Sequence, residues 1–358
     1  MKRFTNIALI LVIFSAIVIT IGCTIYNINI GSVSKNEELK DIEIKAGNSY
    51  LTIAPILKEN KLIKSELFYK LYIKIFEPKS LEACHYKLSE SMNVKALVAE
   101  LEKGCQSNPN AFNITFKEGL NMRSIAKTIV ANTNNSEDDV FDLLSDTSYL
   151  DEIINQYWFL TNDIKNSKIY YPLEGYLFPN TYQFANKDVS VKDIFEVMLK
   201  QTDKKLTAYK EKIENQEYTV HQLLTLASIV ELEAANSNDR AGVAGVFYNR
   251  LNDNWALGSD VTTYYAIKIE MSERDLYQSE LDDYNAYNTR NALMSGKLPV
   301  SPICNPGIES IGAVIEPKDH EYYYFVADKN KKTYFSKTGS QHDAIISELK
   351  SSGLWYEY

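Results

Sequence analysis

Cysteine and histidine are scarce in this chain, with four of each among 358 residues. The cysteines, Cys23, Cys84, Cys105 and Cys304, lack the short spacings of a zinc site, and the histidines are scattered. We therefore expect neither a metal ion nor another cofactor. Pairing of Cys84 with Cys105 stays an open alternative if this part of the chain is exported.

Positive charge is also in short supply. The 38 Lys and Arg residues face 47 Asp and Glu residues, which gives a formal net charge of -9 at pH 7. A chain of this charge repels a polyanion, so we expect no nucleic-acid partner. Hydrophobic residues make up 45% of the sequence and charged residues 24%, as in globular proteins with a sizeable core. The length indicates two or three domains.

Charge is missing altogether from residues 7–25, which follow Lys2 and Arg3 and precede the next charge at Lys35. An apolar run of this length can cross the core of a bilayer. The preceding positive charges predict a cytoplasmic N-terminus and an extracytoplasmic remainder. The run is long for a signal peptide and no A-x-A-like cleavage site follows it. We therefore favour an uncleaved single-pass anchor in the cell membrane over a cleaved leader.

Two stretches before the middle of the chain repeat one pattern. Residues 42–57 and 114–129 each predict a short strand, a Lys-x-Gly turn and an amphipathic helix, with Thr52 and Ser124 as the helix caps. A strand–turn–helix unit of this kind resembles half of a LysM-type glycan-binding module. It is equally consistent with an α/β spacer that holds the rest of the chain away from the membrane.

Further elements complete an α+β fold. The domains that we expect are an anchor over residues 1–30, LysM-like strand–helix repeats over 31–165 and a mixed α+β catalytic domain over 166–358. The remaining predicted elements are a strand at 86–88, a helix at 92–104, acidic helices across 131–168 with an exposed loop at 132–135, a solvent-facing helix at 189–212, a short helix to Ile315, strands at 322–327 and through Phe335, and a helix from Ser340.

The helix predicted at residues 219–235 is unusual because it is apolar or small on nearly every side. Thr219 and Gln222 form a capping-box pattern at its start. Such a helix is expected to be buried. Two carboxylates near its end, Glu231 and Glu233, therefore need an explanation, since a buried charge is costly unless it is paired or functional.

The two glutamates are not equivalent. Glu231 shares a face with Ala227, Ser228 and small residues of the next turn, whereas Glu233 lies roughly 200° around the axis and faces away. Burial and the negative end of the helix are expected to raise the pKa of Glu231. A carboxyl group that stays protonated near neutral pH is what a general acid requires. The alternative is that both glutamates cap a helix end that emerges into solvent.

Several loops around this helix carry polar and aromatic residues. Residues 171–182 combine four aromatic rings with Glu174, a composition that suits a saccharide, although a structured core loop explains it as well. Asp239 is predicted to cap a second helix that carries Arg240 and Arg250, which either lie at the surface or pair with buried acids. The loops at 257–265, 287–290 and 296–307 are candidate walls of a cleft.

In this order, the segments resemble the MltG/YceG-like family of membrane-anchored endolytic peptidoglycan transglycosylases. The resemblance runs essentially from end to end of the chain. It implies a lytic transglycosylase, a carbon–oxygen lyase, that cleaves the MurNAc–GlcNAc bond of peptidoglycan glycan strands. The products would carry 1,6-anhydro-MurNAc ends, and the reaction would terminate nascent strands, with peptidoglycan synthases as candidate partners. The most specific motifs are residues 173–179, 227–231, 239–251, 259–260, 287–289 and 305–307.

By motif, the catalytic glutamate of the family falls on Glu231. The chain departs from the usual family pattern around Asp260 and at Arg290, which stands where a Tyr is usual. The positions that the resemblance assigns to substrate binding or support are Glu174, Tyr176, Glu233, Arg240, Asn249, Ser259, Asp260, Tyr287, Asn288, Thr289 and Asn305.

In the implied reaction Glu231 first protonates the glycosidic oxygen and then, as a carboxylate, removes the proton of the sugar's own 6-hydroxyl, which closes the anhydro ring. Ordinary glycoside hydrolysis uses two carboxylates instead. Glu233 is on the wrong face to be a second one, but Glu174 or Asp260 qualifies, so a two-carboxylate glycoside hydrolase remains an alternative. A non-catalytic peptidoglycan-binding scaffold is the alternative from another class.

Overall fold

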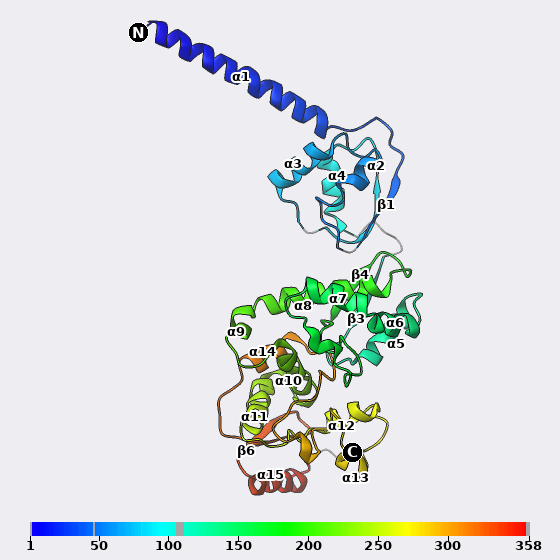
Figure 1. Cartoon of the computed structure of the whole chain (residues 1–358), viewed down its shortest axis with the longest axis vertical. Coiled ribbons are helices and arrows are strands. Elements are labelled where there is room, and N and C mark those ends of the chain that lie inside the picture. The colour runs from blue at the N-terminus through cyan, green and yellow to red at the C-terminus, as the bar shows by residue number, and fades with distance from the viewer. Residues whose placement is uncertain (1, 46, 80, 105–110, 356–358) are drawn as a thin grey trace. The chain divides into compact units, whose positions relative to one another are not determined.

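The computed structural model describes residues 2–45, 47–79, 81–104 and 111–355 (Figure 1). The chain forms two compact units. The first unit comprises residues 1–113 and 183–189, and the second unit comprises residues 114–182 and 190–358. Helices and short strands occur in both units, which confirms the predicted mixed α+β class.

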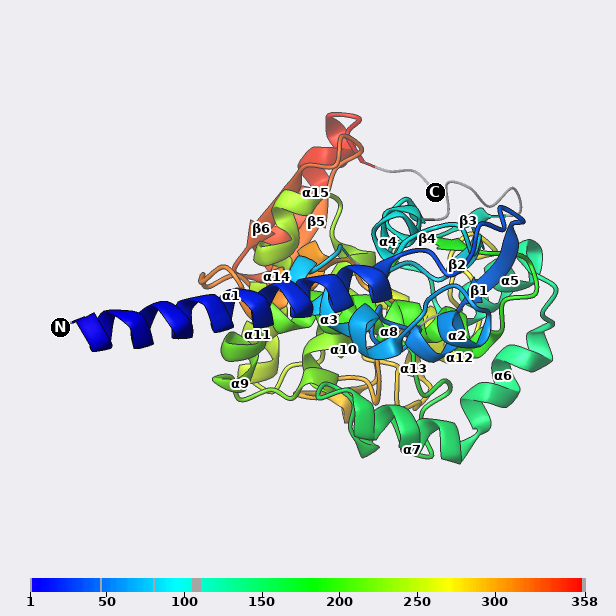
Figure 2. The same ribbon diagram turned by 90° about the horizontal axis from the view of Figure 1, so that it is seen from above.

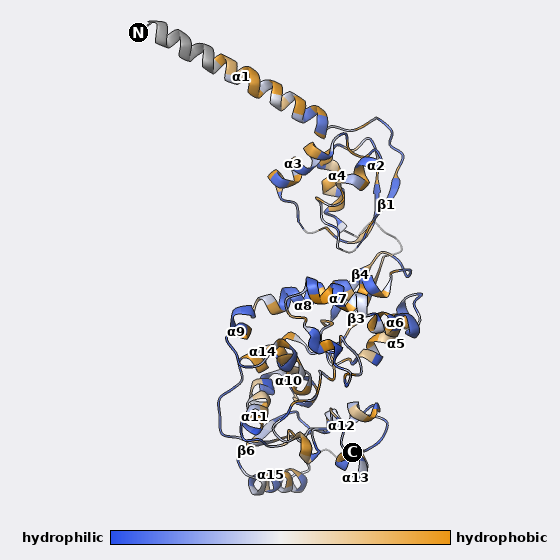
Figure 3. Cartoon of the chain, viewed as in Figure 1, coloured by the Kyte–Doolittle hydropathy of each residue, from blue (hydrophilic) through white to orange (hydrophobic). Residues whose placement is uncertain are grey.

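The N-terminal helix α1 (Lys2–Ile30) is 29 residues long. Its segment Ile13–Ile30 has a mean hydropathy of 1.8. By length and composition it is the one helix, within the described part of the chain, that is able to cross a membrane. Figure 3 shows this segment as mostly hydrophobic.

The rest of the first unit is a two-stranded sheet with three helices. Strand β1 (Lys40–Ile44) runs antiparallel to β2 (Cys84–Leu88), with Lys40 opposite Leu88. Alternate residues of both strands point into the core, as in a sheet with one covered face. Cys84 is disulfide-bonded, and Cys105 lies outside the described residues. The helices that complete this core are α2 (Ala54–Glu59), α3 (Glu66–Phe76) and α4 (Val94–Leu101).

The repeated pattern is a strand, a turn and a helix in both copies. The first copy gives β1 and α2, and the second gives β3 (Phe112–Phe116) and α5 (Met122–Asn132). Gly47 and Gly119 have φ values of 88° and 78°, which confirms a glycine turn in each copy. The likeness to LysM modules stays a prediction.

The predicted caps of these two helices are wrong. The N-cap of α5 is Asn121, whose side chain accepts the N–H of Ser124, because the Asn comes first and already satisfies that donor. In the first copy the N-cap is Ile53, and the hydroxyl of Thr52 instead accepts the N–H of Ser49.

The second unit is mainly helical. Strand β3 pairs with β4 (Asn180–Phe184), and β5 (Tyr324–Ala327) pairs antiparallel with β6 (Thr333–Ser336). Its other elements, after α5, are α6 (Glu137–Ser145), α7 (Thr147–Gln156), η2 (Asn162–Lys165), α8 (Val191–Thr207), α9 (Lys210–Glu214), α10 (Val220–Glu233), η3 (Ser237–Asp239), α11 (Arg240–Asn252), α12 (Asp260–Ile267), α13 (Gln278–Asp282), η4 (Ala292–Met294), α14 (Ile308–Ile315) and α15 (Gly339–Ser351).

Three details of the predicted second unit need correction. The segment 189–212 is not one solvent-facing helix, because it breaks into α8 and α9 and α8 buries one whole face. The loop at 132–135 is not fully exposed, since Thr133 is buried. Asp239 stands at the N-cap of α11 but makes no capping bond; its carboxylate accepts Asn236 Nδ2 at 2.6 Å.

Helix α10 forms the centre of the second unit. Its predicted capping box is present, with Thr219 and Gln222 each accepting the other's backbone N–H. All residues from Leu223 to Val230 are buried, and α10 packs against α11, α12 and α14 (Figures 1 and 2). The end of α10, with Glu231 and Glu233, is therefore held by its neighbours on several sides.

Candidate active site

Glu231 is fully engaged in hydrogen bonds within the protein. Its Oε1 accepts Arg240 Nη2 at 2.9 Å, and its Oε2 accepts the Gly307 N–H at 2.9 Å and the Ser310 hydroxyl at 2.7 Å. The side chain is only 6% exposed. Because Gly307 is the N-cap of α14, the carboxylate also meets the positive end of that helix. Glu231 thus links α10 to the starts of α11 and α14.

Further acids surround the same guanidinium. Arg240 Nη1 binds Glu309 at 2.5 Å, and Nη2 lies 3.9 Å from Glu118. Partial burial is the main cause that raises the pKa of Glu118, and the nearby negative charge of Glu231 raises it further. The cluster joins the turn after β3 to α10, α11 and α14, and Arg240 is its only cation among the described ion pairs.

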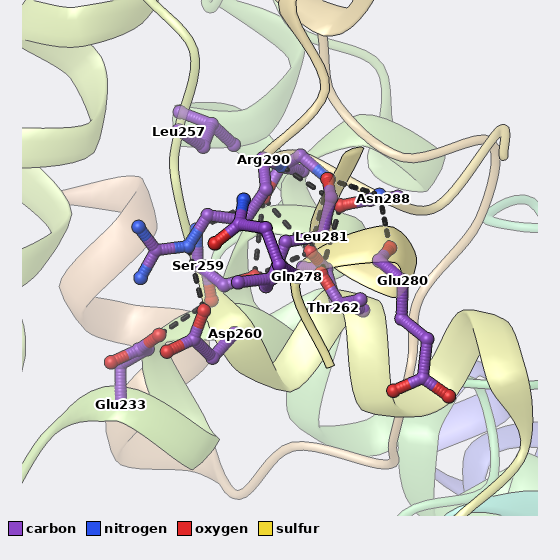
Figure 4. A network of polar contacts seen from close by, with 12 residues as sticks. Glu233, Leu257, Ser259, Asp260, Thr262, Gln278, Glu280, Leu281, Asn288 and Arg290 are labelled. Carbon is purple, nitrogen blue, oxygen red and sulfur yellow. Dashed lines mark hydrogen bonds and ion pairs between the residues drawn. The ribbon is translucent and has the colours of Figure 1, made fainter. Parts of the chain in front are cut away.

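Glu233 faces away from this cluster, as the helical geometry predicted. It lines a cavity of about 890 Å³, and the Ser259 hydroxyl donates to its Oε1 at 2.5 Å (Figure 4). Desolvation by the surrounding protein raises the pKa of Glu233, and the negative charge of Asp260 adds to the rise. The hydrogen bond from Ser259 and the charges of Arg290 and Arg250 oppose it.

The cavity that Glu233 lines has both polar and apolar lining residues, here called its polar wall and its other wall. A volume of this size is typical of ligand sites, and aromatic rings beside polar groups suit a saccharide. The polar wall consists of Glu233, Arg250, Ser259, Asp260, Asp275, Arg290 and His342. The other wall includes Phe247, Leu257, Tyr264, Met271, Leu276, Leu281, Tyr324 and Phe325.

A hydrogen-bonded pair of loops builds the polar wall. Ser259 N–H donates to Thr289 Oγ1 at 3.1 Å, and Arg290 Nε pairs with Asp260 at 2.6 Å. Asn288 Nδ2 donates to the carbonyl oxygens of residues 280, 281 and 283, which holds this loop against α13 (Figure 4). Residues predicted from two separate motifs, Ser259–Asp260 and Asn288–Thr289, therefore belong to one network, and Ser259 and Asp260 line the cavity together with Glu233.

Glu174 forms a separate buried centre. It is 1% exposed and accepts hydrogen bonds from Met122 N–H and Tyr265 Oη at 2.9 Å and from Asn305 Nδ2 at 3.1 Å. Burial raises the pKa of Glu174 to about 7. Asn305 also accepts the Leu177 N–H, so both predicted residues hold loops together and neither lines the cavity of Glu233.

Three other predicted residues hold segments of the second unit together. The hydroxyl of Tyr176 is bonded to His221 Nδ1 at 2.8 Å in the core. Tyr287 accepts the Tyr170 N–H through its buried hydroxyl. Asn249 Nδ2 donates to the carbonyl oxygens of residues 320 and 322, just before β5. All three are held by protein partners, so their contacts are with neighbouring segments.

Sequence reasoning gave His342 no role, although it lines the cavity from the C-terminal helix α15. His85, His221 and His320 each have a ring nitrogen within 2.9 Å of a protein oxygen. Within the described residues, no hydrogen bond involves either ring nitrogen of His342, and its Nδ1 is buried. Its ring packs on Tyr324, with centroids 5.4 Å apart. A single histidine more than 100 residues after Glu233 gives no local sequence signal of this position.

Arg250, for which the sequence allows either a surface position or a buried ion pair, belongs to the same wall. Its Nε donates to the Tyr323 carbonyl oxygen at 2.7 Å, and its guanidinium also binds the Leu257 carbonyl oxygen. Desolvation lowers the pKa of Arg250, and the charge of Glu233 partly offsets this. Arg250 is thus a partly buried cation that lines the cavity rather than a surface charge.

A desolvated carboxyl group with a hydroxyl donor at the wall of a polar cavity is the arrangement of general acid–base enzymes. Among the described residues, no group of three or more His, Cys, Asp and Glu side chains is placed to hold a metal ion. Residues 42–348 match the sequence model of the YceG-like family, and the chain belongs to that family.

Curated relatives and a solved structure agree with this assignment. The endolytic murein transglycosylase of Bacillus subtilis (strain 168) is 36% identical over 315 residues, which cover 87% of this chain and 85% of that protein. The endolytic murein transglycosylase of Streptococcus pneumoniae serotype 2 (strain D39 / NCTC 7466) is 30% identical over 330 residues, 87% of this chain and 59% of that protein. The crystal structure of a yceG-like protein from Listeria monocytogenes matches with a TM-score of 0.61 and 34% identity, covering 87% of this chain and 100% of that one.

Proposed function

We propose that this protein is an endolytic murein transglycosylase that cleaves the MurNAc–GlcNAc bond within peptidoglycan strands and leaves 1,6-anhydro-MurNAc ends. The names of two relatives with 36% and 30% identity support the activity. The observation that carries the proposal is the position of Glu233, a desolvated carboxyl group at the wall of a cavity of about 890 Å³.

Glu233 is the acid in this proposal, in place of the Glu231 that the sequence motif suggested. Both oxygens of Glu231 are occupied by Arg240, Gly307 and Ser310, and the residue does not line the cavity. Glu233 does line it, and its raised pKa favours the protonated form that an acid needs. Glu231 then holds the end of the helix that carries the acid.

The proposed reaction needs one carboxyl group. Glu233 donates its proton to the glycosidic oxygen as the bond to the anomeric carbon of MurNAc breaks. The resulting carboxylate takes the proton of the MurNAc 6-hydroxyl, whose oxygen bonds to the anomeric carbon and closes the anhydro ring. The acid is thereby regenerated, and no external water is consumed.

Neighbouring groups have distinct roles in this reaction. Ser259 orients the carboxyl of Glu233 through the 2.5 Å hydrogen bond. Asp260, by its charge, favours the protonated acid before the reaction, and Arg250 favours the carboxylate after proton transfer. His342 contacts the glycan, because its ring is fixed against Tyr324 while its nitrogens have no partner within the described chain.

The cellular setting is proposed on different grounds. Helix α1 anchors the protein in the cell membrane, with the N-terminus in the cytoplasm and the cavity outside. Nascent strands near the membrane would then be the substrate, and peptidoglycan synthases, which make them, the neighbours.

A two-carboxylate hydrolase is the second candidate, because Asp260 lines the same cavity as Glu233. The products separate the two reactions. The protein is incubated with purified murein strands, and the new ends are separated by chromatography and weighed by mass spectrometry. Ends with 1,6-anhydro-MurNAc are expected. New reducing ends would identify a hydrolase, and an absence of cleavage would indicate a protein that binds murein without cutting it.

A further inference from the structure

Helix α3 in the first unit exposes a row of large apolar side chains. Leu67, Leu71 and Ile75 follow one another at four-residue intervals, so they lie on one face of the helix, and they are 72%, 42% and 58% exposed. The other side of α3 is buried through Tyr69 and Ile73 and belongs to the core of this unit. A row of this kind is not needed for folding and requires another explanation.

Lysines accompany the apolar row. Lys70 and Lys74 lie one position before Leu71 and Ile75, which places them along one edge of the row, and Lys70 is paired with Glu66 at 3.2 Å. Apolar side chains beside lysines are the pattern of helices that lie in the surface of a membrane.

The start of α3 contacts the end of α1. The ring of Phe68 lies 6.2 Å from that of Tyr26, and Lys64 Nζ donates to the Ile28 carbonyl oxygen at 3.1 Å. Tyr26 and Ile30 also pack against the core of the first unit. These contacts lie within one unit, and α3 is a neighbour of the end of α1 (Figure 1).

The contacts fix the depth of α3 relative to a membrane around α1. The uncharged apolar run at residues 7–25 is about 28 Å long at 1.5 Å per residue, close to the roughly 30 Å of a bilayer core. Tyr26 directly follows this run and therefore lies at the end of the hydrocarbon layer. A helix whose Phe68 touches Tyr26 lies at the level of the lipid headgroups, where aromatic rings are enriched.

We propose that α3 lies on the outer leaflet of the membrane, with Leu67, Leu71 and Ile75 inserted among the lipids. The helix is an extension of the anchor: α1 crosses the bilayer, and α3 covers the lipid next to the point where α1 leaves it. The two lysines lie at headgroup level, where anionic lipids attract them. The inference rests on the proposed membrane anchoring and is independent of the reaction.

The test measures lipid contact in the full-length chain. One accessible cysteine is introduced at a time by Leu71→Cys, Val18→Cys or Glu43→Cys in a Cys23→Ser background, in which the remaining free thiol of the described residues, Cys304, is buried, and each introduced cysteine carries a bimane fluorophore. The proteins are reconstituted in vesicles of phosphatidylcholine and phosphatidylglycerol whose acyl chains bear a shallow nitroxide quencher. The matched control is Glu43, an exposed residue of β1, and this strand lies on the side of the first unit away from α3 (Figures 1 and 2).

We expect quenching at positions 18 and 71 and little at position 43. In a second protein, Leu67→Glu with Ile75→Glu should abolish quenching at position 71 and leave that at position 18. Quenching at 18 with position 71 no different from position 43 would overturn the inference, and leave the anchor intact. No quenching at 18 would overturn both. Cleavage of soluble glycan strands, measured on the same samples, reports the proposed function separately.

Discussion

Replacing Glu231 by Gln removes a charge from the link between α10, α11 and α14. The amide oxygen of Gln can still accept Gly307 N–H and Ser310 Oγ, but its NH2 group then faces the N–H groups of Arg240. Two donors in contact repel each other. The variant therefore loses the ion pair and gains an unfavourable contact in a site that is only 6% exposed.

The cost follows from the burial of both partners. Breaking a buried ion pair typically costs about 3–5 kcal/mol. Arg240 keeps Glu309 as a partner, so we expect the free energy of unfolding to fall by about 2–3 kcal/mol, at or just below the low end of this range. In a unit of this size each kcal/mol lowers Tm by about 2–4 °C, which gives an expected loss of about 4–12 °C.

Thermal unfolding of the full-length protein measures the effect, and Glu309→Gln is the matched control. Glu309 binds the same guanidinium but is 59% exposed, so its loss should cost less than about 1 kcal/mol. Well below its transition, Glu231→Gln should keep most of the wild-type cleavage rate. A normal Tm together with lost cleavage would refute the reasoning and return the role of the acid to Glu231.

Other variants test the cavity and the buried centre. Ser259→Ala removes a hydrogen bond that stabilises ionised Glu233, so the pKa of Glu233 should rise. Because the acid acts in its protonated form, kcat/KM should then persist to higher pH. Asp260→Asn removes a negative charge and lowers the pKa of Glu233, so the fall of kcat/KM at high pH should move to lower pH. Shifts in the same direction for the two variants would contradict the assignment of Glu233 as the acid. Burial raises the pKa of Glu174 from 4.5 to about 7, so stability should fall by about 3 kcal/mol as pH rises from 4.5 to 7. Urea unfolding of Glu174→Gln should lack this slope, and an unchanged slope would show that the carboxyl does not titrate there. His342→Phe keeps the packing on Tyr324 but removes both nitrogens, so kcat/KM should fall roughly 3- to 10-fold at unchanged Tm, whereas full activity would exclude a glycan contact.

Local signals were enough to predict the helix that carries the site. The Thr219–Gln222 capping box and the uniformly apolar run after it predict a buried helix, and 3.6 residues per turn separate the faces of Glu231 and Glu233. These features depend on residues close in sequence. The glycine turns of both repeats follow in the same way, since only a few residues accept their positive φ.

Which face meets the cavity depends on distant segments. The face of Glu231 looks smooth and apolar in sequence, but the fold brings Arg240 and the start of α14 onto it. The opposite face receives Ser259 from before α12 and shares its cavity with His342 from α15. Neither approach leaves a periodic signal in the sequence, so the motif alone points to Glu231, and only the contacts from distant segments favour Glu233 as the acid.

The most direct test compares Glu233→Gln with Glu231→Gln in the rate at which 1,6-anhydro-MurNAc ends form from purified murein strands. Loss of a positioned acid typically costs a factor of about 10²–10⁴. We expect that loss for Glu233→Gln, with thermal unfolding unchanged, while Glu231→Gln remains active. Near-normal formation of anhydro ends by folded Glu233→Gln would contradict the assignment of the acid.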